Sequence, residues 1–180
     1  MIMTKLRDVL EYRLPYLVIS IDLPFTLNDD VVVDIETTGL DYVSDWIISY
    51  GYVVRDKANV ITLAFGDIGK FSTFCRGLTK LLKKSGFRLW AWYKDFEEEF
   101  LGVKFNELQL RPYEKEEAAL SFGFDPPAKG EDVPKLWREW CKYGDVKALR
   151  KIALRNLYDI VIEAASLARH KLYRVINGAD

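Results

Sequence analysis

An α/β fold, with a mixed β-sheet flanked by α-helices, is predicted for this chain by three features of its sequence. Residues 30–36 form an unbroken valine-rich run, which is typical of a strand buried on both faces of a sheet. Residues 45–56 and 59–67 have the composition of two further strands, joined as a hairpin by the short segment RDKAN. From Val146 to Leu167, apolar residues recur every three or four positions, which is the period of an amphipathic helix. Strands followed by helices predict a sheet with helices packed on it.

The remaining elements follow from local composition and from turn residues. Helix ends are expected where Ser85 and Gly86 stop an apolar run, and where Pro134 stands near a first turn. The helix that ends at Ser85 and Gly86 is short. The aromatic segment RLWAWY, which follows it, favours a strand. Asp95 is the expected N-cap of the next helix. In chain order, these expected elements are strands at 14–23 and 69–75, a helix at 77–87, a strand at 88–93, a helix from 95, and helices at 132–144 and 145–176.

Length and charge bound the organisation of the chain. With 180 residues, 49% of them hydrophobic, the sequence predicts a single domain over 1–180, with 1–28 as an N-terminal extension or edge strand. The 26 basic and 27 acidic residues nearly cancel, so the composition argues against a strongly basic protein that coats DNA. A nucleic-acid enzyme with a small footprint is compatible with this balance, because local patches matter more than net charge.

Cysteine and histidine usage argues against a zinc site. Cys75 and Cys141 are far apart in sequence and His170 is the single histidine, so a thiolate or imidazole site is not expected. The chain also lacks a long apolar run and a signal-peptide pattern at its N-terminus. We therefore expect a soluble cytoplasmic protein with free thiols and no membrane partner.

Two carboxylates end the valine-rich strand. Asp34 and Glu36 are two residues apart, so their side chains leave the same face of the strand. Two acids at the end of a buried strand are costly unless something neutralises them, and divalent cations do so with oxygen ligands. The alternative is that Glu36 simply lies in solvent where the strand ends.

The segment DIETTGL, which contains these acids, resembles the first motif of the DEDD-type 3′-to-5′ exonucleases of the ribonuclease H-like superfamily. Residues 130–168 are similar to the C-terminal part of the YprB-like ribonuclease H-like family, whose third-motif aspartate corresponds to Asp159. Residues 111–124 resemble the segment that precedes it. The resemblance extends over about residues 30–170.

This resemblance implies a ribonuclease H-like fold and hydrolysis of phosphodiesters with two Mg²⁺ or Mn²⁺ ions, roughly 3.5–4 Å apart. By position, Asp34 would bridge both ions, Glu36 would bind one, and Asp159 would bind from the last helix. One ion makes the attacking water more acidic and the other stabilises the leaving oxygen.

The second motif of the resembled family departs from its pattern here. The chain has WYKDFEEEFL, and alignment on Phe96 and Leu101 places Glu97 where the family has an aspartate. Glu97 is the preferred fourth metal ligand and catalytic acid, and Asp95 is its rival. A third possibility is that neither binds metal, because acids are common in the first turn of a helix.

The third motif departs as well. Where the family has a tyrosine or histidine that orients water, this chain has Arg155 and Leu154. Arg155 cannot act as a base, but it can either clamp a substrate phosphate or pair with Asp159 and neutralise it. Tyr158 points away from Asp159 on a helix, and His170 is not expected to be a base.

Basic and aromatic residues near the motifs suggest contacts with substrate. Lys147, Lys151 and Arg155 lead at four-residue steps to Asp159, and this stripe either follows a nucleic-acid backbone or is a solvated helix face. The side chains expected to contact substrate are Thr37, Tyr93, Lys151 and Arg155.

The function expected from the resemblance is a metal-dependent 3′-to-5′ exonuclease acting on single-stranded ends of DNA or RNA. The polarity rests on the resemblance alone. The first alternative is a catalytically weak or inactive protein or subunit that binds nucleic acid, which the Arg155 substitution favours. The second is an endonuclease of the same superfamily.

Overall fold

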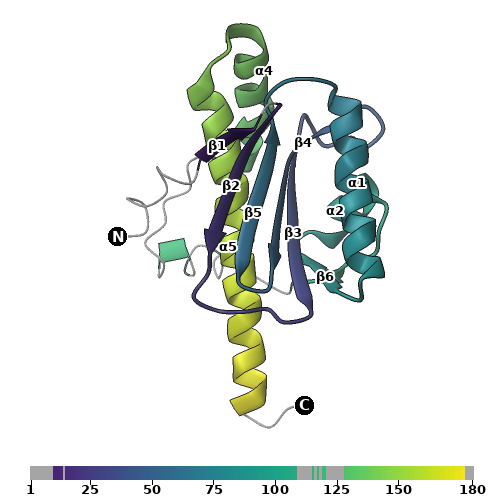
Figure 1. The fold of residues 1–180 in the computed structure, drawn as a ribbon, viewed down its shortest axis with the longest axis vertical. Coiled ribbons are helices and arrows are strands. Elements are labelled where there is room, and N and C mark those ends of the chain that lie inside the picture. Colours follow the sequence, from purple (N-terminus) through teal and green to yellow (C-terminus); the bar gives the residue numbers. More distant parts are fainter. Residues whose placement is uncertain are drawn as a thin grey trace.

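The computed structural model describes residues 10–13, 15–108, 115, 117, 119–120 and 128–176. Within these residues, the chain forms a mixed seven-stranded sheet with helices on both faces (Figure 1). The predicted α/β class, with a mixed sheet flanked by helices, is therefore confirmed at this level.

The strand order places β3 near the middle of the sheet. The order across the sheet is β1-β2-β5-β4-β3-β6-β7. Neighbouring strands from β1 to β3 are antiparallel, whereas β6 is parallel to β3 and β7 is parallel to β6. The strands are β1 (Leu10–Arg13), β2 (Tyr16–Asp22), β3 (Asp30–Thr37), β4 (Ile47–Val54), β5 (Lys57–Leu63), β6 (Arg88–Ala91) and β7 (Asn106–Glu107).

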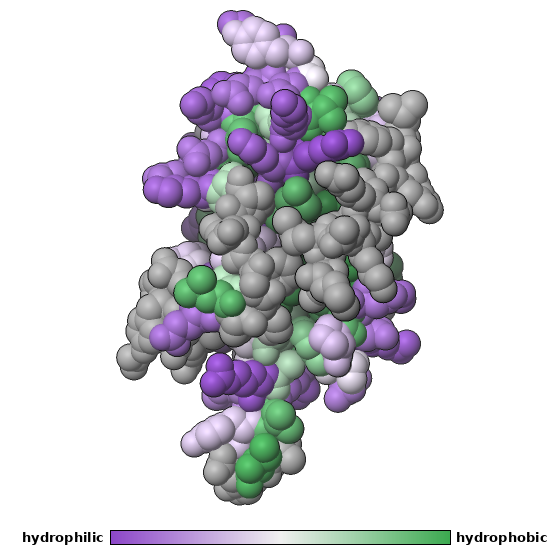
Figure 2. Space-filling model, turned by 90° about the vertical axis from the view of Figure 1, so that its left-hand side faces the viewer, coloured by the Kyte–Doolittle hydropathy of each residue, from purple (hydrophilic) through white to green (hydrophobic). Residues whose placement is uncertain are grey.

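Two layers of helices enclose this sheet. The helices α1 (Ile68–Lys84) and α2 (Lys94–Leu101) cover one face, and α4 (Val133–Tyr143) and α5 (Val146–Ile176) cover the other (Figure 1). A short 3₁₀ turn, η2 (Gly130–Asp132), leads into α4. The helix α5 crosses β3, β4 and β5, and its C-terminal end projects beyond the sheet (Figure 1). Figure 2 shows hydrophobic residues at that projecting end, where Leu172 and Ile176 are exposed.

The strand β3 is buried on both faces, as its valine run predicts. Val31 and Val33 pack in the core beneath α1, whereas Val32 packs in the core beneath α5. Because side chains alternate along a strand, Asp34 shares the face of Val32. Both Asp34 and Glu36 therefore face α5.

Most of the predicted elements are present with shifted ends. The strands expected at 14–23, 30–36, 45–56, 59–67 and 88–93 correspond to β2, β3, β4, β5 and β6. The helices expected at 132–144 and 145–176 correspond to α4 and α5. In α4, Pro134 lies in the first turn as predicted, and Trp140 is buried with its indole N–H donating to the Ala64 carbonyl at 2.9 Å.

The prediction of a strand at 69–75 is wrong, because this segment forms the first half of α1. Asp67 caps the helix by accepting a hydrogen bond from the Lys70 backbone N–H at 3.0 Å. Phe71, Cys75 and Thr79 recur at the helical spacing of four and are buried against the sheet. The cap and the buried face together extend the predicted helix at 77–87 back to Ile68.

Two smaller expectations are also wrong. Asp95 is not the N-cap of α2, because the helix begins at Lys94 and Tyr93 occupies the cap position without a side-chain hydrogen bond. The apolar stripe of α5 is expected to include Val146, but this residue lies in the first turn and is exposed.

Other expectations from composition have a direct structural counterpart. Both cysteines are free thiols, with Cys75 buried and Cys141 exposed. Among the described helices, none combines the length and the apolar character needed to cross a membrane.

Most of the segment 111–124 lies outside the described residues, which include only Lys115, Glu117 and 119–120 of it.

Candidate metal centre

Three acids, two from β3 and one from α5, converge between the sheet and α5. Asp34 and Glu36 come from β3 and Asp159 comes from the middle of α5. One carboxylate oxygen from each lies within 4.8 Å of the others. Asp34 is partly buried, and Glu36 and Asp159 are buried. The structure thus brings together the three acids that the first and third motifs single out.

A glycine on the neighbouring strand allows α5 to approach the acids. Gly51 of β4 pairs with Asp34 of β3. A Cβ atom at Gly51 would lie 2.0 Å from the Asn156 Oδ1 atom and 2.8 Å from the Ile160 Cγ2 atom, so no larger residue fits. The space is used by Asn156, whose side-chain amide donates to the Asp34 backbone carbonyl at 3.2 Å and to Asp34 Oδ2 at 2.9 Å. This amide fixes the orientation of the Asp34 carboxylate.

Arg155 lies beside the three acids. Its NH2 atom is 2.7 Å from Asp159 Oδ2, and its Nε atom is 3.8 Å from Glu36 Oε1. Of the two roles predicted for Arg155, the pairing with Asp159 is present in the structure. Its Nε–H has no hydrogen-bond partner among the described residues, which leaves one donor for another group.

A second cation enters from the segment before α4. The Lys115 ammonium lies 2.7 Å from Asp159 Oδ1 and 2.8 Å from Glu163 Oε1. It also lies 4.0 Å from the centroid of the Trp92 ring, a cation–π contact. Lys115 is 6% exposed and Glu163 is fully buried, so this ion pair lies inside the protein.

The two candidates for the second-motif acid differ in position. Glu97 is 3% exposed, and its Oε2 atom has no hydrogen-bond partner among the described residues. Asp95 is exposed to solvent on the other side of the first turn of α2. Glu97 lies outside the group of three acids, but its charge interacts with Glu163 and Glu36. Burial near the site therefore favours Glu97 over Asp95.

The electrostatics of the site oppose ionisation of its acids. Burial, and then repulsion from Asp159, raise the pKa of Glu36 to about 8. Burial also raises the pKa of Glu163 to about 7, although Lys115 opposes the shift. The pKa values of Asp34 and Glu97 are raised well above their ordinary values, again chiefly by burial. Burial lowers the pKa of Lys115, but attraction to Glu163 and Asp159 outweighs this and raises it above the usual value for lysine.

These residues fit a hard divalent cation. The donors are carboxylate oxygens, which suit Mg²⁺ and Mn²⁺ rather than zinc. Besides the three acids, the buried Oε2 atoms of Glu97 and Glu163 have no hydrogen-bond partner within the described part of the chain. Buried carboxylates that repel one another and lack donors are stabilised either by protons or by a bound cation.

Thr37, one of the expected substrate contacts, lies at the end of β3 and holds the loop that follows it. Its side chain is buried, and its hydroxyl donates to the Gly39 carbonyl. In the same loop, the Thr38 hydroxyl donates to Asp45 Oδ1 at 2.9 Å and accepts from the Trp46 backbone N–H at 2.9 Å. The TTGLD segment is therefore a hydrogen-bonded loop.

Tyr93 lies on the surface, at a shallow pocket formed by the loop after β3 and the start of α2. Its side chain is 60% exposed and packs against Trp92, with ring centroids 4.6 Å apart. The pocket has a volume of about 400 Å³ and is lined by Leu40, Tyr93, Lys94, Asp95, Phe96 and Glu107.

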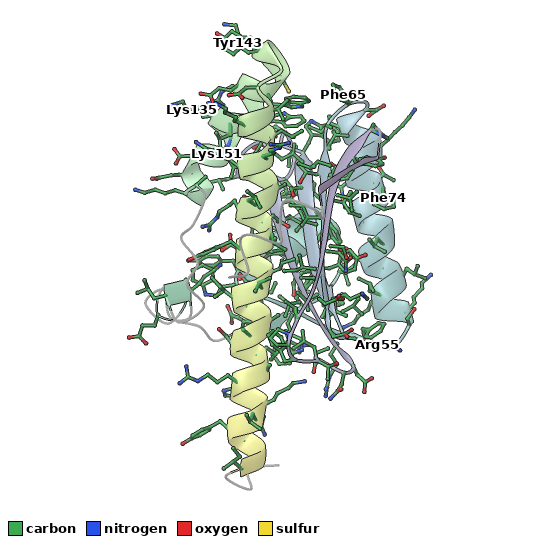
Figure 3. All side chains as sticks on the ribbon, turned by 60° about the vertical axis from the view of Figure 1, so that its left-hand side comes forward. Arg55, Phe65, Phe74, Lys135, Tyr143 and Lys151 are labelled. Atoms are coloured by element: carbon green, nitrogen blue, oxygen red, sulfur yellow. The ribbon has the colours of Figure 1, made fainter. Side chains whose placement is uncertain are left out.

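Lys151 is exposed on α5, one turn before Arg155. Figure 3 shows Lys151 and Lys135 extending from the same side of the layer formed by α4 and α5. Hydrophilic residues gather over this end of the molecule in Figure 2. The exposed basic residues here are Lys135, Arg138, Lys142, Lys147, Arg150 and Lys151. Acidic residues such as Glu131, Asp132 and Asp145 are exposed at the same end.

Sequence reasoning missed several residues of the site. Glu163 follows Asp159 by four positions, so helical spacing could have placed it on the same face of α5. Asn156 precedes Asp159 by three positions and could have been found in the same way. Lys115 and Gly51 have no such signal, because only the tertiary fold brings them to the acids.

Comparison of the sequence with protein-family models and with curated proteins finds no match.

Proposed function

We propose that this chain is a divalent-metal-dependent nuclease of the ribonuclease H-like class, a 3′-to-5′ exonuclease acting on single-stranded DNA or RNA ends. The observation that carries the proposal is the convergence of Asp34, Glu36 and Asp159, with ligand atoms within 4.8 Å of one another. These are the acids that the first and third motifs of the resembled family would supply.

The fold supports the proposal. The antiparallel strands β5, β4 and β3 are followed by the parallel strands β6 and β7, with helices on both faces. This arrangement is compatible with a ribonuclease H-like fold. It places Asp34 and Glu36 on the central strand, opposite a helix that carries the third acid.

The residues of the chain have distinct roles in this proposal. Asp34, Glu36 and Asp159 would hold the metal, with Glu97 nearby as a further buried carboxylate. When bound, a divalent metal makes its water more acidic and stabilises negative charge on phosphate oxygens. Asn156 orients Asp34 through its amide. Arg155, which is always protonated, contributes positive charge next to Asp159, where a scissile phosphate would approach.

The surface around the site offers places for a single strand. Tyr93 and Phe96 line the pocket beside the loop that follows Glu36, and an exposed aromatic ring there could stack on a base. Lys147 and Lys151 lie on the exposed turns of α5 that precede Arg155, and they could contact phosphates. Such contacts need no sequence-specific readout.

The test is hydrolysis of 3′-labelled single-stranded DNA and RNA with Mn²⁺ or Mg²⁺. We expect stepwise release of labelled nucleotide that requires the metal and falls at least about 100-fold in Asp34→Asn, since even outer-shell changes at metal sites cost 10–100-fold. Absence of release by the wild type, or equal release by Asp34→Asn, contradicts the proposal. Cleavage of a circular single strand would instead favour an endonuclease.

The same assay decides between the two second-motif candidates. Glu97→Gln removes a buried carboxylate near the site, whereas Asp95→Asn removes an exposed one two residues away. We expect Glu97→Gln to lower the rate by roughly 10–100-fold and Asp95→Asn to leave it nearly unchanged. Equal rates for the two variants would show that Glu97 is not part of the site.

A second candidate function is a non-catalytic protein of the same class that binds nucleic acid. The observation that favours it is that both oxygens of Asp159 lie 2.7 Å from a protein cation, Lys115 or Arg155. If these cations replace the metal altogether, the chain should bind oligonucleotides without hydrolysing them. Binding that is unaffected by Mn²⁺, together with no turnover, would support this candidate.

A further inference from the structure

The two sides of the acid cluster differ in how much positive charge the chain places next to them. On the α5 side, Asp159 Oδ1 is 2.7 Å from the Lys115 ammonium and Asp159 Oδ2 is 2.7 Å from Arg155 NH2. Glu163 on the same helix also pairs with Lys115, at 2.8 Å. The α5 side is thus already supplied with positive charge by the chain itself.

On the β3 side, the described residues supply less positive charge. Asp34 forms no ion pair with a lysine or arginine among the described residues, and its Oδ2 atom accepts only the neutral amide of Asn156. Glu36 has Arg155 Nε as its nearest cationic atom, at 3.8 Å. The two carboxylates of β3 therefore have less positive charge in direct contact than the acids of α5, because Glu36 has one ion pair at 3.8 Å and Asp34 has none among the described residues.

Lys115 is held in its position by more than one contact. Its ammonium bridges Asp159 and Glu163 and lies over the Trp92 ring, 4.0 Å from the centroid. Only 6% of the residue is exposed. Contacts from α5 and from the segment after β6 therefore fix this positive charge inside the site, unlike a surface lysine that samples many rotamers.

We infer that Lys115 takes the place of the second metal ion, so that this site binds a single divalent cation. This inference rests on the proposed function. The one ion would be held by Asp34 and Glu36, with Asp159 as a shared ligand through its remaining lone pairs. Lys115 supplies the second positive charge on the α5 side.

Electrostatic repulsion makes a second ion beside Lys115 costly. Two like charges a few ångströms apart repel strongly in a buried site, where water screens them poorly. A second divalent ion would also need oxygens of Asp159 and Glu163 that already contact the ammonium. Removal of the ammonium would free those oxygens, which would add to the buried Oε2 atoms of Glu97 and Glu163 that already lack partners among the described residues.

The test counts Mn²⁺ ions on the full chain without substrate. Equilibrium dialysis gives the number bound, and electron paramagnetic resonance distinguishes an isolated Mn²⁺ from a magnetically coupled pair. The variants are Lys115→Met, which keeps the length of the side chain without its charge, and Lys80→Met as a control. Lys80 is exposed on α1, on the opposite face of the sheet. Circular dichroism checks that each variant is folded.

We expect one isolated Mn²⁺ ion in the wild type and in Lys80→Met, and two coupled ions in Lys115→Met. Two coupled ions in the wild type overturn the inference, even if Lys115→Met fails to fold. A single ion in a folded Lys115→Met also overturns it, because Lys115 is then not what limits the count. Both of these outcomes leave the proposed nuclease function in place. No binding to the wild type would instead contradict the metal site on which that function depends.

Discussion

Gly51 and Asn156 determine how closely α5 approaches the acids of β3. Gly51 lies opposite Asp34 on the face that α5 covers, and the absence of a side chain there leaves room for Asn156. The Asn156 amide then reaches both the backbone carbonyl and the carboxylate of Asp34. The position of Asp159 relative to Asp34 thus depends on a glycine one strand away.

Gly51→Ala should therefore destabilise the protein. The new Cβ would lie 2.0 Å from Asn156 Oδ1, so α5 or Asn156 must shift, at a cost of roughly 1–3 kcal/mol. The matched control is Gly77→Ala on α1, where a Cβ meets nothing within 4 Å. That change should stabilise the helix by about 0.5–1 kcal/mol. Urea unfolding of both variants measures the difference, and equal stabilities would contradict this account of Gly51.

The residues of the site differ in whether their place in it could be predicted from the sequence. Asp34 and Glu36 are recognisable because a buried strand ends in two acids on one face, and Glu163 lies at helical spacing from Asp159. Lys115 is different, since its distance from Asp159 along the chain gives no hint of an ion pair. Arg155 was predicted beside Asp159, but helical spacing could not tell pairing from phosphate binding.

Among the elements, Asp30 connects β3, β6 and α5. It is fully buried and accepts hydrogen bonds from Arg88 Nε at 2.9 Å and from Trp90 Nε1 at 2.6 Å. It also forms an ion pair with Lys171 near the C-terminal part of α5. This carboxylate lies at the opposite end of β3 from Glu36 and fixes the long helix across the sheet.

Asp30→Asn should cost about 1.5–3 kcal/mol of unfolding free energy, because hydrogen bonds to a buried charge are lost or weakened. Arg88 is 61% exposed, so part of its loss is regained from water. Asp29→Asn, at the exposed neighbouring position, is expected to change stability by less than about 0.5 kcal/mol. Thermal and urea unfolding of the pair check this, and a similar effect at both positions would mean that Asp30 is not a specific link.

Elements with a strong hydrophobic period were predicted most closely, whereas a short segment without one was assigned the wrong structure. The apolar run of β3 and the stripe of α5 gave the central strand and the long helix with ends close to those observed. The segment 69–75 misled because its aromatic residues favour a strand locally, whereas the Asp67 cap and the face of Phe71 and Cys75 make it helical. Tertiary burial decided the outcome there.

For the whole molecule, the buried acids couple stability to pH and to metal. The pKa of Glu36 is raised to about 8 in the folded state, above the ordinary value of about 4.3 for glutamate. A folded state that binds more protons than the unfolded state loses stability as pH rises between these values. The stabilising contribution is complete below about pH 4.3 and is lost as pH passes through about 8.

We therefore expect the metal-free protein to unfold at a lower temperature at about pH 8.5 than at about pH 6. A loss of only about 2 kcal/mol would lower Tm by roughly 4–8 °C in a chain of this size. Mn²⁺ should raise Tm more at the higher pH, because protons compete with it less. Glu36→Gln should flatten the pH dependence. Scanning calorimetry in a chelator and then with Mn²⁺ measures both effects, and a pH-independent Tm would contradict the account.

The proposed function depends on a divalent-metal site formed by Asp34, Glu36 and Asp159. Its most direct test is calorimetric titration of Mn²⁺ into the wild type, Asp34→Asn and the exposed control Asp29→Asn. We predict saturable binding in the wild type and control, weakened at least about tenfold in Asp34→Asn. Equal binding by all three proteins, or no saturable binding by the wild type, would contradict the proposal.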